Sequence, residues 1–97
     1  RALDVTPRTV ANLRRAGDAD TAAMLTALVA DEVRHVAAGR RWFELVCAAR
    51  GLAPVATYHE LVRRHYRAGL KPPFNADARA AAGLTPEFYE PLARPSD

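Results

Sequence analysis

The 97 residues of the chain are 49% hydrophobic and 26% charged, which is typical of one small globular domain or of a part of one. No apolar run approaches the roughly 20 residues of a membrane-spanning helix, and the single cysteine, Cys47, excludes an internal disulfide and a multi-cysteine zinc site. The net charge of +3 rests on basic residues that are spread along the chain, whereas nucleic-acid binders usually gather them on one face.

The first two predicted helices are bounded by residues that favour helix ends. Thr6 and Pro7 predict the start of a short helix, because a threonine cap followed by proline is typical of a first helical turn. Gly17 ends this helix. Asp18 or Asp20 then caps a long helix that runs to about residue 50, where a glycine follows.

The rest of the chain alternates short helices with breaks rich in proline and glycine. The predicted elements are a helix over residues 55–67, an extended segment over 71–74, a helix over 76–82 capped by Asn75, a last turn from Thr85 to Tyr89, and a loose tail that contains Pro91 and Pro95. No segment alternates apolar and polar residues as a half-buried strand does, and no internal repeat occurs. The predicted fold class is therefore all-α.

The long helix carries a row of residues at alternating steps of three and four. We call this row the seam, and it consists of Leu25, Leu28, Glu32, His35, Gly39, Trp42 and Val46. At roughly 100° per residue, all seven positions lie within about 50° of one direction, while Arg34, Arg40, Arg41 and Glu44 point to the other side. The mostly apolar seam predicts a core-facing surface, in which Glu32 and His35 occupy two consecutive positions.

An acid and an imidazole in a core need a partner, since a buried carboxylate must be paired, hydrogen-bonded or bound to metal. Glu32 and His35 lie one helical turn apart, so both side chains can reach one metal ion from a single rigid helix. Carboxylate with imidazole suits iron, manganese or zinc. Alternatively, the two residues form a buried polar pair that only fixes the register of the helices.

Several stretches spread through nearly the whole chain resemble one bacterial family. They are Leu3–Pro7, Asp31–Val36, Arg41–Phe43, Leu70–Asn75, Ala80–Gly83 and Phe88–Leu92, of which Leu70–Asn75 is the most specific. In these stretches the chain resembles the ferritin-like family known as domain of unknown function 455. This resemblance implies a fold like that of the di-iron carboxylate proteins, in which two Glu-x-x-His helices face two others that each supply a glutamate.

The resemblance also implies that the chain is the C-terminal part of a longer domain, in keeping with a first residue that is not methionine. Residues 1–69 would form a portion of the helical bundle, and residues 70–97 a C-terminal extension that packs on it. Only Glu32 and His35 fall on metal-ligand positions of a dinuclear iron or manganese centre. The other ligands would come from the missing N-terminal half of the bundle or from a self-associated copy. Alone, the chain is expected to leave much of its seam uncovered.

The first functional hypothesis is a di-iron oxidoreductase or ferroxidase that uses oxygen, acts on an unidentified small-molecule substrate and is located in the cytoplasm. A second hypothesis is a metal-free helical module that binds a partner protein, with Glu32 and His35 as a structural pair. The third is a basic RNA-binding module, which the scattered arginines do not favour. No membrane partner is expected.

Other side chains have assigned roles that the fold can test. Trp42, Phe43, Tyr58 and Tyr66 are expected to pack in the core, although the two tyrosines could instead be redox-active or contact a substrate if they lie near a metal. Cys47 is expected to be a small buried hydrophobe and His59 to be exposed. His65 is expected to be a hydrogen-bonded core histidine, or else to line a pocket or support a metal ligand. Asp31 either supports a ligating imidazole elsewhere in the bundle or pairs with Arg34 in solvent. The segment from Lys71 to Asn75 is expected to cross a bundle end as a fixed strap.

Overall fold

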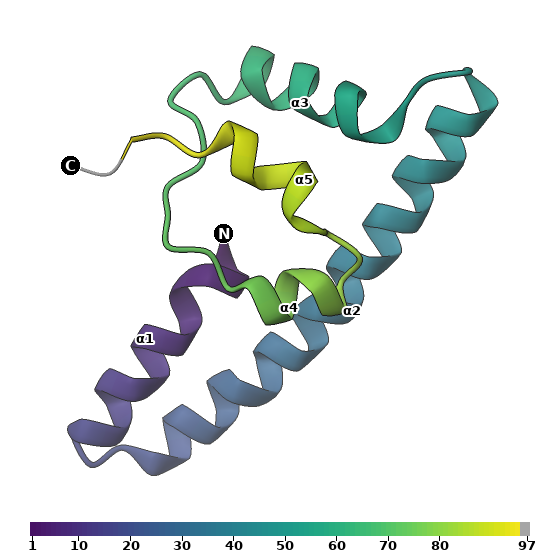
Figure 1. Cartoon of the computed structure of the whole chain (residues 1–97). Coiled ribbons are helices and arrows are strands. Elements are labelled where there is room, and N and C mark those ends of the chain that lie inside the picture. The colour runs from purple at the N-terminus through teal and green to yellow at the C-terminus, as the bar shows by residue number, and fades with distance from the viewer. Residues whose placement is uncertain (96–97) are drawn as a thin grey trace.

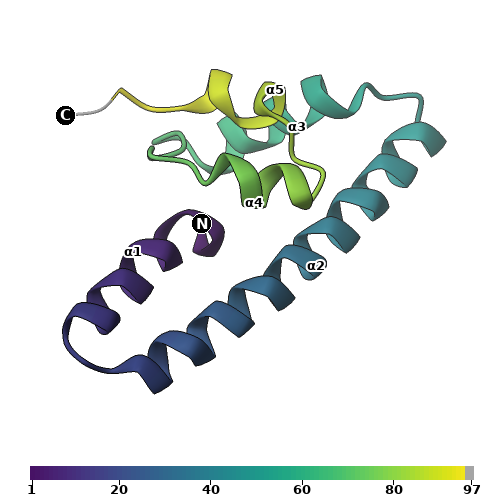
Figure 2. The ribbon, with the colours of Figure 1, turned by 60° about the horizontal axis from the view of Figure 1, so that its bottom comes forward.

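The computed structural model describes residues 1–95 and is all-α, as predicted (Figure 1). Its elements are α1 (Ala2–Arg15), α2 (Ala19–Ala49), α3 (Pro54–His65), α4 (Ala76–Ala81), α5 (Pro86–Tyr89) and a 3-10 turn (Glu90–Leu92). The helices α1 and α2 form an antiparallel hairpin, and α3 folds back from the far end of α2. The two short helices, α4 and α5, lie between α1, α3 and the second half of α2 (Figure 2). Within residues 1–95, no helix is both long and apolar enough to cross a membrane.

The first helix begins at Ala2, so the prediction that Thr6 caps it and Pro7 opens it is wrong. A proline inside a helix lacks the N–H that would bond to the carbonyl four residues earlier, and here that carbonyl belongs to Leu3. The side-chain amide of Asn75 donates to the Leu3 carbonyl oxygen instead, at 3.0 Å. Tertiary contact with the C-terminal part of the chain thus compensates for the proline and extends the helix past it.

The predicted bounds of α2 are confirmed. Asp18 is the N-cap, and its carboxylate accepts a hydrogen bond from the backbone N–H of Thr21 at 3.1 Å. Burial is slight there, and the hydrogen bonds from Thr21 hold the pKa of Asp18 below its usual value of 3.8. Gly51 follows the helix with φ of 66°, the left-handed conformation that favours glycine at a helix end.

Most of the later boundaries are also confirmed, with two differences. Asn75 caps α4 by accepting from the Ala78 N–H at 3.1 Å, and α5 ends at Tyr89. The third helix ends at His65, two residues earlier than predicted. The segment after α5 is not a loose tail, because Leu92 is buried and its neighbours pair with the backbone of Leu70.

The face of α2 that is covered within this chain lies one residue beyond the predicted seam, or roughly 100° around the helix. Its buried or half-buried members include Ala22, Val29, Val33, Val36, Arg40, Phe43 and Cys47. Tyr58 lies between Phe43 and Phe88, with edge-on ring contacts at 6.2 and 5.6 Å between centroids. The helix therefore has two apolar stripes, and α1, α3 and the extension cover only one of them.

Arg40, on the side of α2 away from the seam, is half-buried under the extension. Its guanidinium lies 4.6 Å from the centre of the Phe88 ring, its Nε donates to the Gly83 carbonyl at 3.2 Å, and its Nη1 pairs with Glu44. Packing against an aromatic ring lets an arginine occupy a half-buried position with its donors satisfied. This contact fixes the extension against the middle of α2.

Candidate functional site

Glu32 and His35 lie side by side near the middle of α2, as their spacing predicts. His35 Nδ1 is 3.6 Å from Glu32 Oε2, and the side chains are 74% and 45% exposed, respectively. Both belong to the seam, which is largely uncovered within residues 1–95, as expected for the chain without the rest of the bundle. The physical reason is the choice of stripe, because α1 and the extension cover the neighbouring face of the helix.

Most apolar residues of the seam are exposed along with the polar pair, whereas Leu25 is half-buried. Trp42, expected to anchor a core, is 69% exposed, and Leu28 and Val46 are also exposed, as expected for this chain alone. Met24 lies at the edge of the same face and is exposed too, and so is Leu45, which lies roughly 60° beyond that edge. The acid and the imidazole therefore lie in the middle of a long uncovered apolar surface.

The residues present fit half of a metal site rather than a complete one. Among residues 1–95, no group of three or more His, Cys, Asp or Glu side chains is close enough to hold a metal ion. One carboxylate and one imidazole on successive turns are a donor set that iron, manganese or zinc accepts. Further ligands from outside this part of the chain would be needed to complete the coordination shell. The assignment of Glu32 and His35 as ligands stays a prediction.

The remaining candidates near the seam take structural roles. Asp31 pairs with Arg34 at 2.5 Å in solvent, which agrees with the simpler of its two predicted roles. Cys47 is fully buried, as predicted, and Phe43 is half-buried against Tyr58.

Two predicted positions on and after α3 are wrong, and a third is confirmed in one of its alternatives. His65 is exposed rather than buried in a core, and it lines a hollow at the end of α3, as its alternative position predicted. Tyr66 is also exposed, since the helix ends just before it and frees the ring from the packed face. His59, expected to be exposed, is half-buried, and its Nε2 donates to the Glu87 carbonyl at 2.8 Å.

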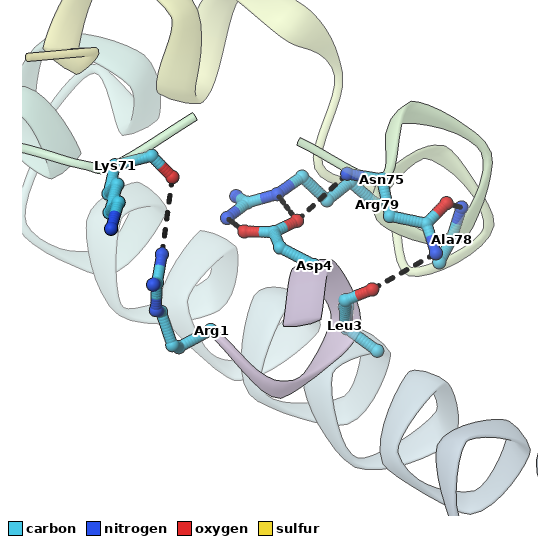
Figure 3. A network of polar contacts seen from close by, with 7 residues as sticks. All are labelled: Arg1, Leu3, Asp4, Lys71, Asn75, Ala78 and Arg79. Carbon is cyan, nitrogen blue, oxygen red and sulfur yellow. Dashed lines mark hydrogen bonds and ion pairs between the residues drawn. The ribbon is translucent and has the colours of Figure 1, made fainter. Parts of the chain in front are cut away.

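A second acid–base pair, which sequence reasoning missed, links the two ends of the chain (Figure 3). Arg79 donates from Nε and Nη2 to the two carboxylate oxygens of Asp4, at 2.9 and 2.6 Å. The Asn75 backbone N–H donates to the same carboxylate at 2.9 Å. We call these three residues the Asp4 clamp. Its ion pair is buried, with the side chains of Arg79 and Asp4 only 8% and 2% exposed.

The surroundings of the clamp set the charge states of its members. Burial alone would raise the pKa of Asp4, but the hydrogen bonds from Arg79 and Asn75 and the charge of Arg79 outweigh it and hold that pKa below 3.8. The hydrogen bond to Asp4 raises the pKa of Arg79 against the opposing effect of burial. Arg79 also lies over the rings of Tyr89 and Phe74, at 4.5 and 5.0 Å from their centres. The clamp therefore stays ionised while almost dry.

Pro7 is one feature of the sequence that indicates a contact between the first turns of α1 and a distant segment. A proline within a helix leaves the carbonyl four residues earlier without its helical partner, so a donor elsewhere in the chain should approach Leu3. The strap that follows Lys71 supplies this donor, and its own Lys71 carbonyl accepts from Arg1 Nη1 at 3.2 Å. The strap thus runs along the first turns of α1.

Comparison with known proteins identifies the family of the chain. The family described as "Protein of unknown function (DUF455)" matches residues 1–90. An uncharacterized protein of Haemophilus influenzae is 31% identical over 85 residues, which cover 88% of this chain but 30% of that protein. The chain thus spans less than a third of this relative's length, and no solved structure matches it significantly. On the match over residues 1–90, the chain belongs to the DUF455 family.

Proposed function

We propose that this chain contributes Glu32 and His35 to a dinuclear iron or manganese centre inside a ferritin-like helical bundle. The observation that carries the proposal is the position of this pair in the middle of an uncovered apolar face of a 31-residue helix. In proteins of the ferritin-like type, metal ligands project from such facing helices into the bundle interior.

The uncovered face supports the part of the proposal that concerns the bundle. Leu28, Trp42 and Val46 are exposed on the same face of α2 as the polar pair, and exposed apolar surfaces of this kind are normally covered by other protein. Helices from outside these residues would cover it and bring the missing carboxylates. They would come from the rest of a longer chain, such as that of the relative from Haemophilus influenzae, or from a second copy.

The chemistry of the pair follows from its residue types. Glu32 would bind or bridge the metal ions as a carboxylate, and His35 would bind through a neutral ring nitrogen. Bound iron or manganese would supply oxygen-dependent oxidation or hydroxylation, or oxidation of ferrous iron itself. Because metal competes with protons for both side chains, retention of the metal should weaken in acid.

Metal content of the complete natural protein, purified without chelator, tests the proposal together with the solution mass. Mass spectrometry should find about two iron or manganese ions per complete bundle. Glu32→Ala and His35→Ala should each lower that content, whereas Glu60→Ala, which removes an exposed carboxylate on α3, should not. A metal content that neither seam variant changes would overturn the assignment of these residues.

The same uncovered face favours a second candidate function, a metal-free helical module that binds a partner protein. Trp42 and Leu45 are large exposed apolar side chains of the kind that anchor protein interfaces. A folded protein of defined mass that contains no metal would favour this candidate. Substitution of Trp42 by Ser would then weaken partner binding without altering any metal content.

A further inference from the structure

A hollow of about 670 Å³ lies beside the clamp, away from Glu32 and His35. The start of α1, the end of α3, the strap and the segment after the 3-10 turn line it, and it is open to solvent on one side. We call it the basic hollow, and its charged lining residues include Arg1, Asp4, Arg67, Lys71, Arg79 and Arg94. Its volume lies in the range of about 300–1,000 Å³ that small-molecule sites occupy.

The positive charge of the basic hollow exceeds its negative charge. Arg79 is neutralised by Asp4 through two hydrogen bonds. Within residues 1–95, the other basic residues of the lining, namely Arg1, Arg67, Lys71 and Arg94, take part in no ion pair. Four further basic residues therefore line one hollow, and the acid among its lining residues within 1–95, Asp4, is already paired with Arg79.

Backbone hydrogen bonds hold the main chain at Arg94 next to the residue that precedes Lys71. The Leu70 N–H donates to the Leu92 carbonyl at 2.9 Å, and the Arg94 N–H donates to the Leu70 carbonyl at 2.8 Å. Gly69, with φ of 76°, makes this approach possible, since a Cβ there would lie 2.9 Å from the Leu92 carbonyl oxygen. Arg94 is thereby fixed next to the strap instead of being free to swing away.

We infer that the basic hollow binds a small molecule that carries at least one phosphate group. Arginine presents a planar fork of donors that matches phosphate, and lysine adds a compact positive charge. Tyr66 lines the same hollow with an exposed ring, and Phe74 adds a second aromatic wall. The arrangement suits a phosphate group next to a planar or apolar portion of the ligand.

Calorimetric titration of the complete natural protein tests this inference with three probes: inorganic phosphate, pyrophosphate and adenosine monophosphate. Wild-type protein should bind at least one of them. The double variant Arg67→Gln, Arg94→Gln should weaken that binding roughly tenfold or more, because hydrogen bonds to charged groups are lost. The variant Arg67→Lys, Arg94→Lys should retain part of the affinity. Tighter binding of adenosine monophosphate than of inorganic phosphate would assign a stacking role to Tyr66.

The matched control is Arg14→Gln with Arg15→Gln, which removes the same charge from the far end of α1, outside the basic hollow. It should leave the affinity for the probes within about twofold, since exposed charges farther apart than a Debye length are largely screened. The inference is overturned if none of the probes binds, or if both double variants weaken binding equally. It is also overturned if an RNA oligonucleotide binds more tightly than every probe and both variants weaken it alike. Circular dichroism and metal content should be unchanged in all variants.

Discussion

Two acid–base pairs in this molecule differ in every physical respect. Glu32 and His35 are neighbours on one helix, 3.6 Å apart, and largely open to solvent. Asp4 and Arg79 are separated by 75 residues in sequence, yet their side chains form two short hydrogen bonds in a buried site. An exposed pair contributes little to the free energy of folding, and its oxygen and nitrogen atoms remain available to bind a ligand. A buried pair in which every such atom is hydrogen-bonded is costly to break, and its atoms are not available to a ligand.

The largest expected effect comes from removing one member of the buried pair. Asp4→Ala leaves the Arg79 guanidinium buried without its counter-ion, so we expect a loss of about 3 kcal/mol or more in the free energy of unfolding. Urea denaturation of the complete natural protein measures it. Asp31→Ala, which breaks an exposed pair with Arg34, is the control and should cost less than about 1 kcal/mol. Equal costs for the two variants would contradict the difference drawn here.

A smaller effect is expected at Asn75, which caps α4 and also donates to the carbonyl that Pro7 leaves unpaired. Asn75→Ala should cost about 1–2 kcal/mol, the sum of a lost cap and a lost hydrogen bond. In a Pro7→Ala background the restored helical N–H should supply the Leu3 carbonyl. The cost of Asn75→Ala should then fall by about 0.5–1 kcal/mol in a double-mutant cycle. Strict additivity would show that Asn75 does not compensate for the proline.

The clamp also predicts how stability responds to acid. The pKa of Asp4 lies below 3.8 in the folded chain, so the folded state holds this proton more weakly than the unfolded state does. The contribution of Asp4 to stability is therefore complete above pH 3.8, and it is lost as the pH falls through the lower pKa that Asp4 has in the folded state. Urea denaturation across this range should show a steeper decline for wild type than for Asp4→Asn. Parallel curves of stability against pH would mean that protonation of Asp4 is not coupled to unfolding.

The contrast between the pairs also explains how much the sequence could predict. Caps and glycines act on the adjacent backbone, so the N-caps at Asp18 and Asn75 and the stop at Gly51 are correctly predicted. The contact between Glu32 and His35 follows from the period of one helix. By contrast, the pairing of Asp4 with Arg79 depends on how distant segments meet, and only the interruption at Pro7 indicated it. The predicted start of α1 is wrong for the same reason, because the contact of Asn75 with Leu3 also joins distant segments.

The seam marks a second limit of the sequence. The long helix has two apolar stripes about 100° apart, and a sequence pattern alone does not say which neighbours will cover which stripe. Phe43 and Cys47 face α3 and the extension, while Trp42 and Val46 stay uncovered. Periodicity identified an apolar face, and most of this face is uncovered in this part of the domain, as expected for the chain alone, but periodicity did not reveal the second stripe, which packs in the core of residues 1–95.

The smallest expected effect on stability is at the exposed pair, and it separates the two proposed functions. Glu32→Leu with His35→Leu should leave the free energy of unfolding of metal-free protein within about 1 kcal/mol of wild type, or raise it where other helices cover the seam. If the pair binds metal, the variant should lose the metal and the extra stability that wild type gains on metal addition. If the pair is only structural, wild type should gain none. A loss of stability as large as that of Asp4→Ala would contradict both proposals, because it would show that Glu32 and His35 hold the fold together as Asp4 and Arg79 do.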